Sequence, residues 1–319
     1  MGKNIEKNKL NIGTLIGEYG AYIALVLLVI VISCVSPEFR TGSNFLNLLR
    51  QASFNGLIAF GMTCVILSDG IDLSVGSTFA LSAIICAELM IHGIPAAAAI
   101  LIALLAGTVL GMVSGVLVTK GRLQPFIATL ITMTAYRGLA LIITDGKPVS
   151  RLAASVKSES GAFLFKVLGK GSFVFGPNDM ISIPIPAIIL ILFLLVFYFV
   201  LHYTTFGRRI YATGSNEKCA KLVGVNTTKI RIAVYSISGF MSALAGLIMI
   251  SRVDSAQPTL GEGYELDAIA AVALGGTSMS GGRGKIVGTI AGVLIIAVLN
   301  NGLNILGVST YYQEVIKAV

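Results

Sequence analysis

Residues 96–118 read AAAAILIALLAGTVLGMVSGVLV and contain no charged side chain. A helix of about 20 apolar residues is long enough to cross the hydrocarbon core of a bilayer. Within this stretch Gly107, Gly111 and Gly115 recur at every fourth position, a spacing that lets helix backbones approach closely in lipid. The segment therefore predicts a transmembrane helix that packs tightly against a neighbouring helix.

Apolar segments of this kind recur along the whole sequence. Hydrophobic residues make up 55% of the 319 residues and charged residues 12%, whereas a soluble domain has about 25% charged residues. We expect membrane-spanning segments at about 21–35, 50–68, 75–91, 96–118, 125–143, 187–201, 230–250, 266–279 and 286–306, and a tenth that starts at Tyr311 and is cut short at Val319. The sequence thus predicts an all-α polytopic membrane protein. It would have one transmembrane domain over 1–319 and about ten transmembrane helices, some short or broken and the last one truncated.

Charged residues lie mainly between the apolar segments, and their distribution orients the chain. The net charge is +8, but no basic face gathers on a soluble module, which argues against nucleic-acid binding. Basic residues concentrate in loops on the same side as Lys3, Lys7 and Lys9, above all at about 202–229, and an excess of Lys and Arg marks cytoplasmic loops. We therefore expect a multi-pass protein of the cell (inner or cytoplasmic) membrane with a cytoplasmic N-terminus. The extracytoplasmic loop at about 144–186 either only spans the gap between two helices or docks an external partner.

Nothing in the sequence supports catalysis, a metal site or a cofactor. The four cysteines are too few and too scattered for a disulfide framework or a metal site, and the patterns G-x-S-x-G, H-E-x-x-H and CxxC are absent. The stretch GGTSMSGGRGK at 275–285 looks like a phosphate-binding loop, but Ile286 stands where that motif needs Ser or Thr. We expect no catalytic residue and no ATP site in this chain.

The motif SDGIDLSVGS, residues 68–77, interrupts two apolar segments with two acidic residues and two glycines. Acidic residues at membrane depth are costly, and they tend to mark a transport pathway or a helix break that lines a polar cavity. Asp69 and Asp72 are therefore candidates for the pathway. Asp72 can alternatively cap the helix that follows it.

The cytoplasmic loop contains a second motif, TFGRRIYATGSNEKCAKLVGVNTTKIRI, at 205–232. Residues 216–222 are good helix formers, and Gly224 follows as a C-terminal stop. A short basic amphipathic helix between two spanning helices has little core beneath it, so it is suited to contact a partner. The alternative is a solvated, charged loop that only fixes the orientation of the chain.

Polar residues inside apolar segments are the remaining candidates. Asn300 and Asn304 are four residues apart and share one face of a helix, and Asn55 lies in an earlier apolar segment. Such residues either hold helices together or line a polar conduit.

Four long motifs occur in one order along the chain: GMTCVILSDGIDLSVGS, ATGSNEKCAKLVGVNTTKIRI, SAQPTLGEGYELDAIAAVALGGTSMSGGRGKIVGT and NNGLNILGVSTYYQ. They closely resemble the permease subunits of bacterial ABC importers for monosaccharides, with ribose as the best match. The resemblance extends from about Asn44 to the end of the chain, with a more variable stretch near 150–185. It implies transport without an ATPase site in this chain, driven by ATP hydrolysis in a partner subunit.

The resemblance also implies partners and site residues. A second permease copy would complete a homodimer in the lipid bilayer, a cytoplasmic ATPase subunit would drive it, and an extracytoplasmic sugar-binding protein would deliver the sugar. The ATPase-coupling loop would contain Gly214, Asn216, Glu217, Ala220 and Gly224. Independently of the resemblance, the polar residues in or between apolar segments make Asn55, Asp69, Asp72, Asn300 and Asn304 the candidates for the substrate pathway.

Two other classes remain to be distinguished from an ATP-driven permease. A stand-alone secondary transporter or facilitator of small polar solutes would need ion-coupling residues at membrane depth, and acids there are scarce beyond Asp69 and Asp72. A membrane-embedded enzyme is disfavoured by the absence of nucleophile and metal patterns.

Overall fold

The computed structural model describes residues 12–156, 158–175 and 181–318, and this part of the chain is mainly helical. Its elements, in chain order, are α1 (Ile12–Val35), a 3-10 helix η1 (Pro37–Arg40), α2 (Gly42–Leu67), α3 (Val75–Ile91), α4 (Ala96–Thr119), α5 (Pro125–Thr144), β1 (Val149–Ser150), α6 (Leu152–Ser155), α7 (Glu159–Lys170), β2 (Ser172–Phe175), β3 (Ile181–Pro184), α8 (Ile185–Tyr203), α9 (Thr205–Ser215), α10 (Glu217–Leu222), α11 (Thr227–Val253), β4 (Ser255–Ala256), α12 (Tyr264–Leu274), α13 (Ile286–Ile305) and α14 (Thr310–Ala318). The last expected segment, from Tyr311, falls within α14, and its expected end at Val319 lies outside the described residues.

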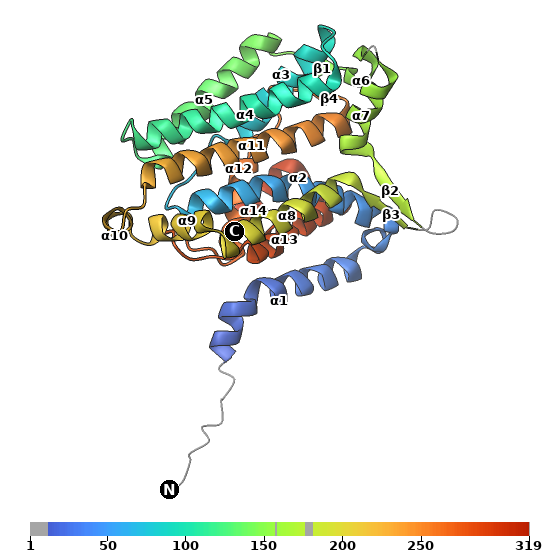
Figure 1. The fold of residues 1–319 in the computed structure, drawn as a ribbon. Helices are drawn as coiled ribbons and strands as arrows, with labels where there is room; N and C mark the ends of the chain where they lie inside the picture. The colour runs from blue at the N-terminus through green and yellow to red at the C-terminus, as the bar shows by residue number, and fades with distance from the viewer. Residues whose placement is uncertain (1–11, 157, 176–180, 319) are drawn as a thin grey trace.

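Short strands correct the all-α expectation at one end of the helix bundle. In the described ranges, β1 pairs antiparallel with β4, and β2 pairs antiparallel with β3. These two ribbons and helices α6 and α7 lie at the right-hand end of the bundle in Figure 1, and α9 and α10 lie at the opposite end. Backbone groups outside helices need hydrogen-bond partners, and the ribbons supply them in the connection at 144–186.

Five helices of the described part are long and apolar enough to cross a membrane, namely α4, α5, α8, α11 and α13. The apolar helices over 19–35 and 75–91 are shorter. Helix α2 is 26 residues long, but Arg50 and Asn55 lower its apolar character, and most of its second half is buried inside the protein. An interior helix contacts protein instead of lipid, so it can contain more polar residues. The chain is a multi-pass membrane protein, and a count of ten spans stays a prediction.

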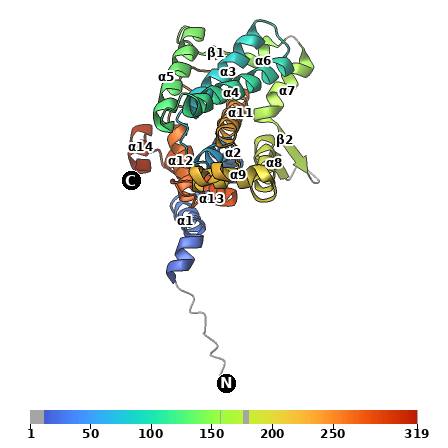
Figure 2. The same ribbon diagram turned by 60° about the vertical axis from the view of Figure 1, so that its left-hand side comes forward.

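Helix α11 runs through the middle of the bundle, with α4 on one side and α2 on the other (Figures 1 and 2). The glycine stripe of α4 faces it as predicted. A Cβ atom on Gly111 would lie 2.2 Å from the carbonyl oxygen of Tyr235, and one on Gly239 would lie 2.2 Å from that of Gly107. The two backbones therefore approach closely enough that only glycine fits.

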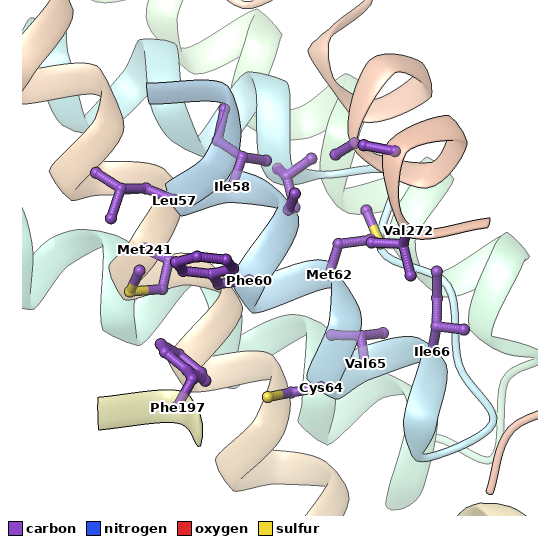
Figure 3. Packing of buried hydrophobic residues seen from close by; sticks show 14 of the residues in the cluster. Leu57, Ile58, Phe60, Met62, Cys64, Val65, Ile66, Phe197, Met241 and Val272 are labelled. Carbon is purple, nitrogen blue, oxygen red and sulfur yellow. The ribbon is translucent and has the colours of Figure 1, made fainter. Parts of the chain in front are cut away.

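The main hydrophobic core surrounds α2 (Figure 3). On one side of α2 the ring of Phe60 lies near Met241 of α11 and Phe197 of α8, and on the other side Ile66 lies near Val272 of α12; Leu57 belongs to the same core. All but Phe197 of these six are fully or almost fully buried. The core holds α2 in the centre of the bundle, and the helix runs from one end of the bundle to the other (Figure 1).

Two short helices, α3 and α12, begin inside this bundle after irregular segments. The first turn of α3 meets the segment that leads into α12, because a Cβ atom on Gly76 would lie 2.3 Å from the carbonyl oxygen of Gly261. The ring of Tyr264 lies 5.6 Å from that of Phe54 and 5.4 Å from that of Phe79, between centroids. Irregular backbone at membrane depth is tolerated where protein surrounds it or where it lines a polar cavity.

Candidate functional site

The helix predicted over 216–222 is present as α10, with Asn216 as its N-cap residue and the expected Gly224 after its C-terminal end. The side chain of Asn216 accepts a hydrogen bond from the backbone N–H of Cys219 at 3.0 Å, which is the usual role of an N-cap residue. Gly224 has φ +85°, and the N–H of Val225 donates to the carbonyl of Ala220 at 3.0 Å. A left-handed glycine of this kind ends a helix by pairing its last carbonyls.

Helix α10 presents two large apolar side chains to its surroundings at its C-terminal end. Leu222 is 86% exposed and Val223 is 79% exposed. Sequence patterning did not single them out, because two apolar residues in a charged loop resemble an ordinary helix face. Leu222 and Val223, together with the half-exposed Glu217, make the exposed tip of the loop a candidate docking surface.

Two of the residues expected in the coupling loop are buried. Ala220 is 3% exposed, and a Cβ atom on Gly214 would lie 1.9 Å from the carbonyl oxygen of Leu67. The same carbonyl accepts a hydrogen bond from the N–H of Gly282 at 3.0 Å. Gly214 therefore holds α9 against the end of α2 and the loop before α13, and Asn216, Glu217 and Gly224 lie nearer the surface.

The structure separates the two acidic residues of the motif at 68–77. Asp69 has φ +61° and a side chain that is 57% exposed. Asp72 is 1% exposed. One of its oxygens accepts from the N–H of Ser74 at 3.0 Å and from the hydroxyl of Ser74 at 2.6 Å, and the other accepts from the hydroxyl of Ser238 at 2.8 Å. Both oxygens of Asp72 thus have donors, from the residue that precedes α3 or from α11. Ser74 is the N-cap residue of α3, and no side chain caps the helix there, so Asp72 braces the start of α3 without being the cap that the alternative described.

The three asparagines have different surroundings. Asn300 donates from Nδ2 to Asp267 of α12 at 3.4 Å, and Asn304 accepts from Gln313 of α14 at 2.8 Å. These contacts link α13 to two neighbouring helices. The Oδ1 atoms of Asn55 and Asn300 are buried without a hydrogen-bond partner among the described residues, and both side chains are under 10% exposed.

A further polar cluster lies where the chain re-enters the bundle between α11 and α12. The guanidinium of Arg137 donates through Nη1 to the carbonyls of Pro258 and Leu260, the latter at 2.8 Å. Its Nε lies 4.0 Å from a carboxylate oxygen of Glu262, whose side chain is 63% exposed. On α12, Asp267 is 3.4 Å from Nζ of Lys317. The sequence analysis did not assign these residues to a site; an arginine inside the apolar segment 125–143 together with acids at 262–267 was the signal that could have paired them.

No group of three or more His, Cys, Asp or Glu side chains that could hold a metal ion occurs in the part of the chain that the structure describes. The apolar spans, the short inner helices and the projecting loop helix define a polytopic membrane protein.

Comparisons with known proteins agree with this class. The family "Branched-chain amino acid transport system / permease component" matches residues 44–319, and the chain belongs to it. A protein of Bacillus subtilis (strain 168) named "Ribose import permease protein RbsC" is 50% identical over 98% of this chain and 93% of its own length. The protein of the same name from Escherichia coli (strain K12) is 47% identical over 95% of this chain and 90% of its own. "D-allose transport system permease protein AlsC" of the same strain is 37% identical over 98% of this chain and 91% of its own. No matching solved structure was found.

Proposed function

We propose that this chain is the membrane-spanning permease subunit of an ATP-driven importer and that it translocates ribose. The near full-length similarity to ribose import permeases supports the substrate. The observation that carries the mechanism is α10, a capped helix whose exposed Leu222 and Val223 have no core to enter. A helix of this kind fits into a groove on a partner subunit, with its apolar side chains as anchors.

The partner of α10 in this proposal is a cytoplasmic ATPase subunit. Glu217 and the apolar tip make the contact, Asn216 and Gly224 shape the helix, and Gly214 and Ala220 hold it to the bundle. A second copy of this chain forms the other half of the pathway, and an extracytoplasmic sugar-binding protein docks on the side of α6, α7 and the two ribbons. Ten spans with a cytoplasmic N-terminus in the inner or cytoplasmic membrane complete the topology.

The pathway we propose differs in part from the set expected from sequence. Asp72 accepts hydrogen bonds from Ser74 and Ser238 and Asn304 accepts one from Gln313, so both serve to hold helices. The solute-facing groups are instead the exposed Glu262 with Arg137, and the buried amides of Asn55 and Asn300 with free oxygens. Charged residues at membrane depth face a bundle interior or a polar cavity, and hydroxyl-rich sugars are bound by such donors and acceptors.

The test is ribose uptake by proteoliposomes that contain this chain, with and without its ATPase and its binding protein. Uptake is expected only when all parts and ATP are present, and D-allose serves as the competing sugar. Replacing both Leu222 and Val223 by Asp should abolish ATP-dependent uptake and co-purification of the ATPase, whereas Lys218→Gln on the same helix should change neither. Ribose flux through this chain alone would overturn the proposal in favour of a facilitator.

A further inference from the structure

One arginine joins the loop helix α10 to the break between α2 and α3. Arg231 lies in the second turn of α11, and its side chain is 15% exposed. Its Nη2 is 3.2 Å from Oε2 of Glu217 on α10 and 3.8 Å from Oδ2 of Asp69 in the break. We infer that Arg231 is a positioning residue that transmits the displacement of α10 to the α2–α3 break, and thereby to helix α3. The inference rests on the proposed function.

The Asp69 end of this link leads directly into the bundle interior. Three residues after Asp69, the chain reaches Asp72, which is bonded to the start of α3 and to Ser238 of α11. Between them, the carbonyl of Ile71 accepts hydrogen bonds from the hydroxyls of Tyr235 at 3.1 Å and Thr129 at 3.3 Å. A shift of Asp69 is therefore passed to α3, because the segment between them is short and held by several hydrogen bonds.

The Glu217 end is equally specific. The carboxylate of Glu217 accepts from the hydroxyl of Thr227 at 3.1 Å and pairs with Lys221 at 2.8 Å. The hydrogen bond from Lys221 is the largest cause that lowers the pKa of Glu217, and the charges of Arg231 and Lys221 also lower it. Because Lys221 stays with Glu217 when Arg231 is removed, α10 keeps a local counter-charge. Loss of Arg231 is thus expected to cut the link between α10 and the break without unfolding the helix.

The arrangement offers a matched control within the same ion-pair group. Lys221 is 58% exposed and contacts Glu217, but no contact with Asp69 joins it to the break among the described residues. Exposed ion pairs contribute little to stability. Arg231, in contrast, is the one basic residue that is paired with carboxylates from both segments in the described part of the chain.

The experiment compares Arg231→Gln, Arg231→Lys and Lys221→Gln in the reconstituted complex with its ATPase and binding protein, and measures ribose transported per ATP hydrolysed. For Arg231→Gln this ratio should fall by about five- to tenfold, the lower part of the range for energetic coupling between two sites, while ATP hydrolysis continues. Arg231→Lys should restore most of the ratio, and Lys221→Gln should leave it unchanged. A merely structural role would lower uptake and hydrolysis together.

Asp69→Asn tests the same contact from the other side and protects the test against a folding defect of Arg231→Gln. Asn tolerates the left-handed backbone of Asp69, and the double variant with Arg231→Gln should lower the ratio no further than either single variant. An unchanged ratio in both Arg231→Gln and Asp69→Asn, or an equal loss in Lys221→Gln, would overturn the inference. Absence of ATP-dependent uptake by the unaltered complex would instead refute the proposed function.

Discussion

Helices α3 and α12 both start inside the bundle, but the segments before them are held in opposite ways. Before α3, side chains converge on one buried carboxylate, since Ser74 and Ser238 donate to Asp72. Before α12, one side chain reaches backbone carbonyls, since Arg137 donates to Pro258 and Leu260. In the first arrangement both oxygens of the buried carboxylate are hydrogen-bonded to protein groups.

The second arrangement leaves polar atoms free. Glu262 is mostly exposed, and it lies in the same irregular segment that Arg137 holds. We call the segment before α3 the closed break and the segment before α12 the open break. The closed break suits a rigid connection between helices, and the open break suits a surface that a hydroxyl-rich solute can contact. The comparison teaches that the acidic residues most visible in the sequence do not share one environment, since Asp72 is buried and bonded on both oxygens and Asp69 is exposed. The cluster around Arg137, less visible in the sequence, is the one that we propose for the pathway.

The sharpest test of the closed break is Asp72→Ala. We expect a loss of about 2–4 kcal/mol in the free energy of unfolding, because buried donors of Ser74 and Ser238 lose their acceptor. The measurement is chemical unfolding of the purified protein in detergent. Asp69→Asn, in the same segment but 57% exposed, is the control and should change stability by less than about 0.5 kcal/mol. Equal effects of the two variants would contradict the distinction between them.

Arg137→Ala probes the open break. The carbonyls of Pro258 and Leu260 lose a charged donor, so we expect the free energy of unfolding to fall by about 1.5–3 kcal/mol. The segment before α12 should also become more accessible to solvent. Accessibility is measured as the rate of thiol labelling of a cysteine placed at Glu262. Lys147→Ala, which removes an exposed pair with Asp145, is the control. A labelling rate that does not rise would show that another contact holds the segment.

The smallest loss of unfolding free energy is expected for a substitution where the two breaks touch, at Gly76. Gly76→Ala places a methyl group against the carbonyl of Gly261 and the carboxylate of Glu265, and the overpacking should cost about 1–3 kcal/mol. Gly138→Ala in α5, where an added Cβ atom meets nothing within 4 Å, should be neutral or stabilising because alanine favours a helix. If both variants behave alike in detergent unfolding, the two breaks do not touch as described.

Several elements could be predicted because their signals are local. The apolar run at 96–118 predicted α4, and its glycine stripe predicted the close contact that α11 makes with it. Asn216 and Gly224 bracket α10 at positions that capping rules prescribe. The ribbons were missed because each strand has only two to four residues, too few for an alternating pattern to show.

Interactions between distant residues could not be predicted in this way. Asn300 and Asn304 share a helix face, as spacing requires, but one contacts α12 and the other α14. Arg231 and Asp69 lie far apart in the sequence and meet only through the packing of α11 against α2. No local sequence pattern predicts that Arg231 pairs with two carboxylates.

The sequence by itself determined that the chain enters a membrane and where its loop helix lies, because hydropathy and helix-end signals act over a few neighbouring residues. The tertiary structure alone decided which acid is buried and which is exposed, which carbonyls Arg137 holds and which segments Arg231 joins. The physical reason is that burial and pairing of a charge depend on which helices pack together, and that packing is set by the whole core.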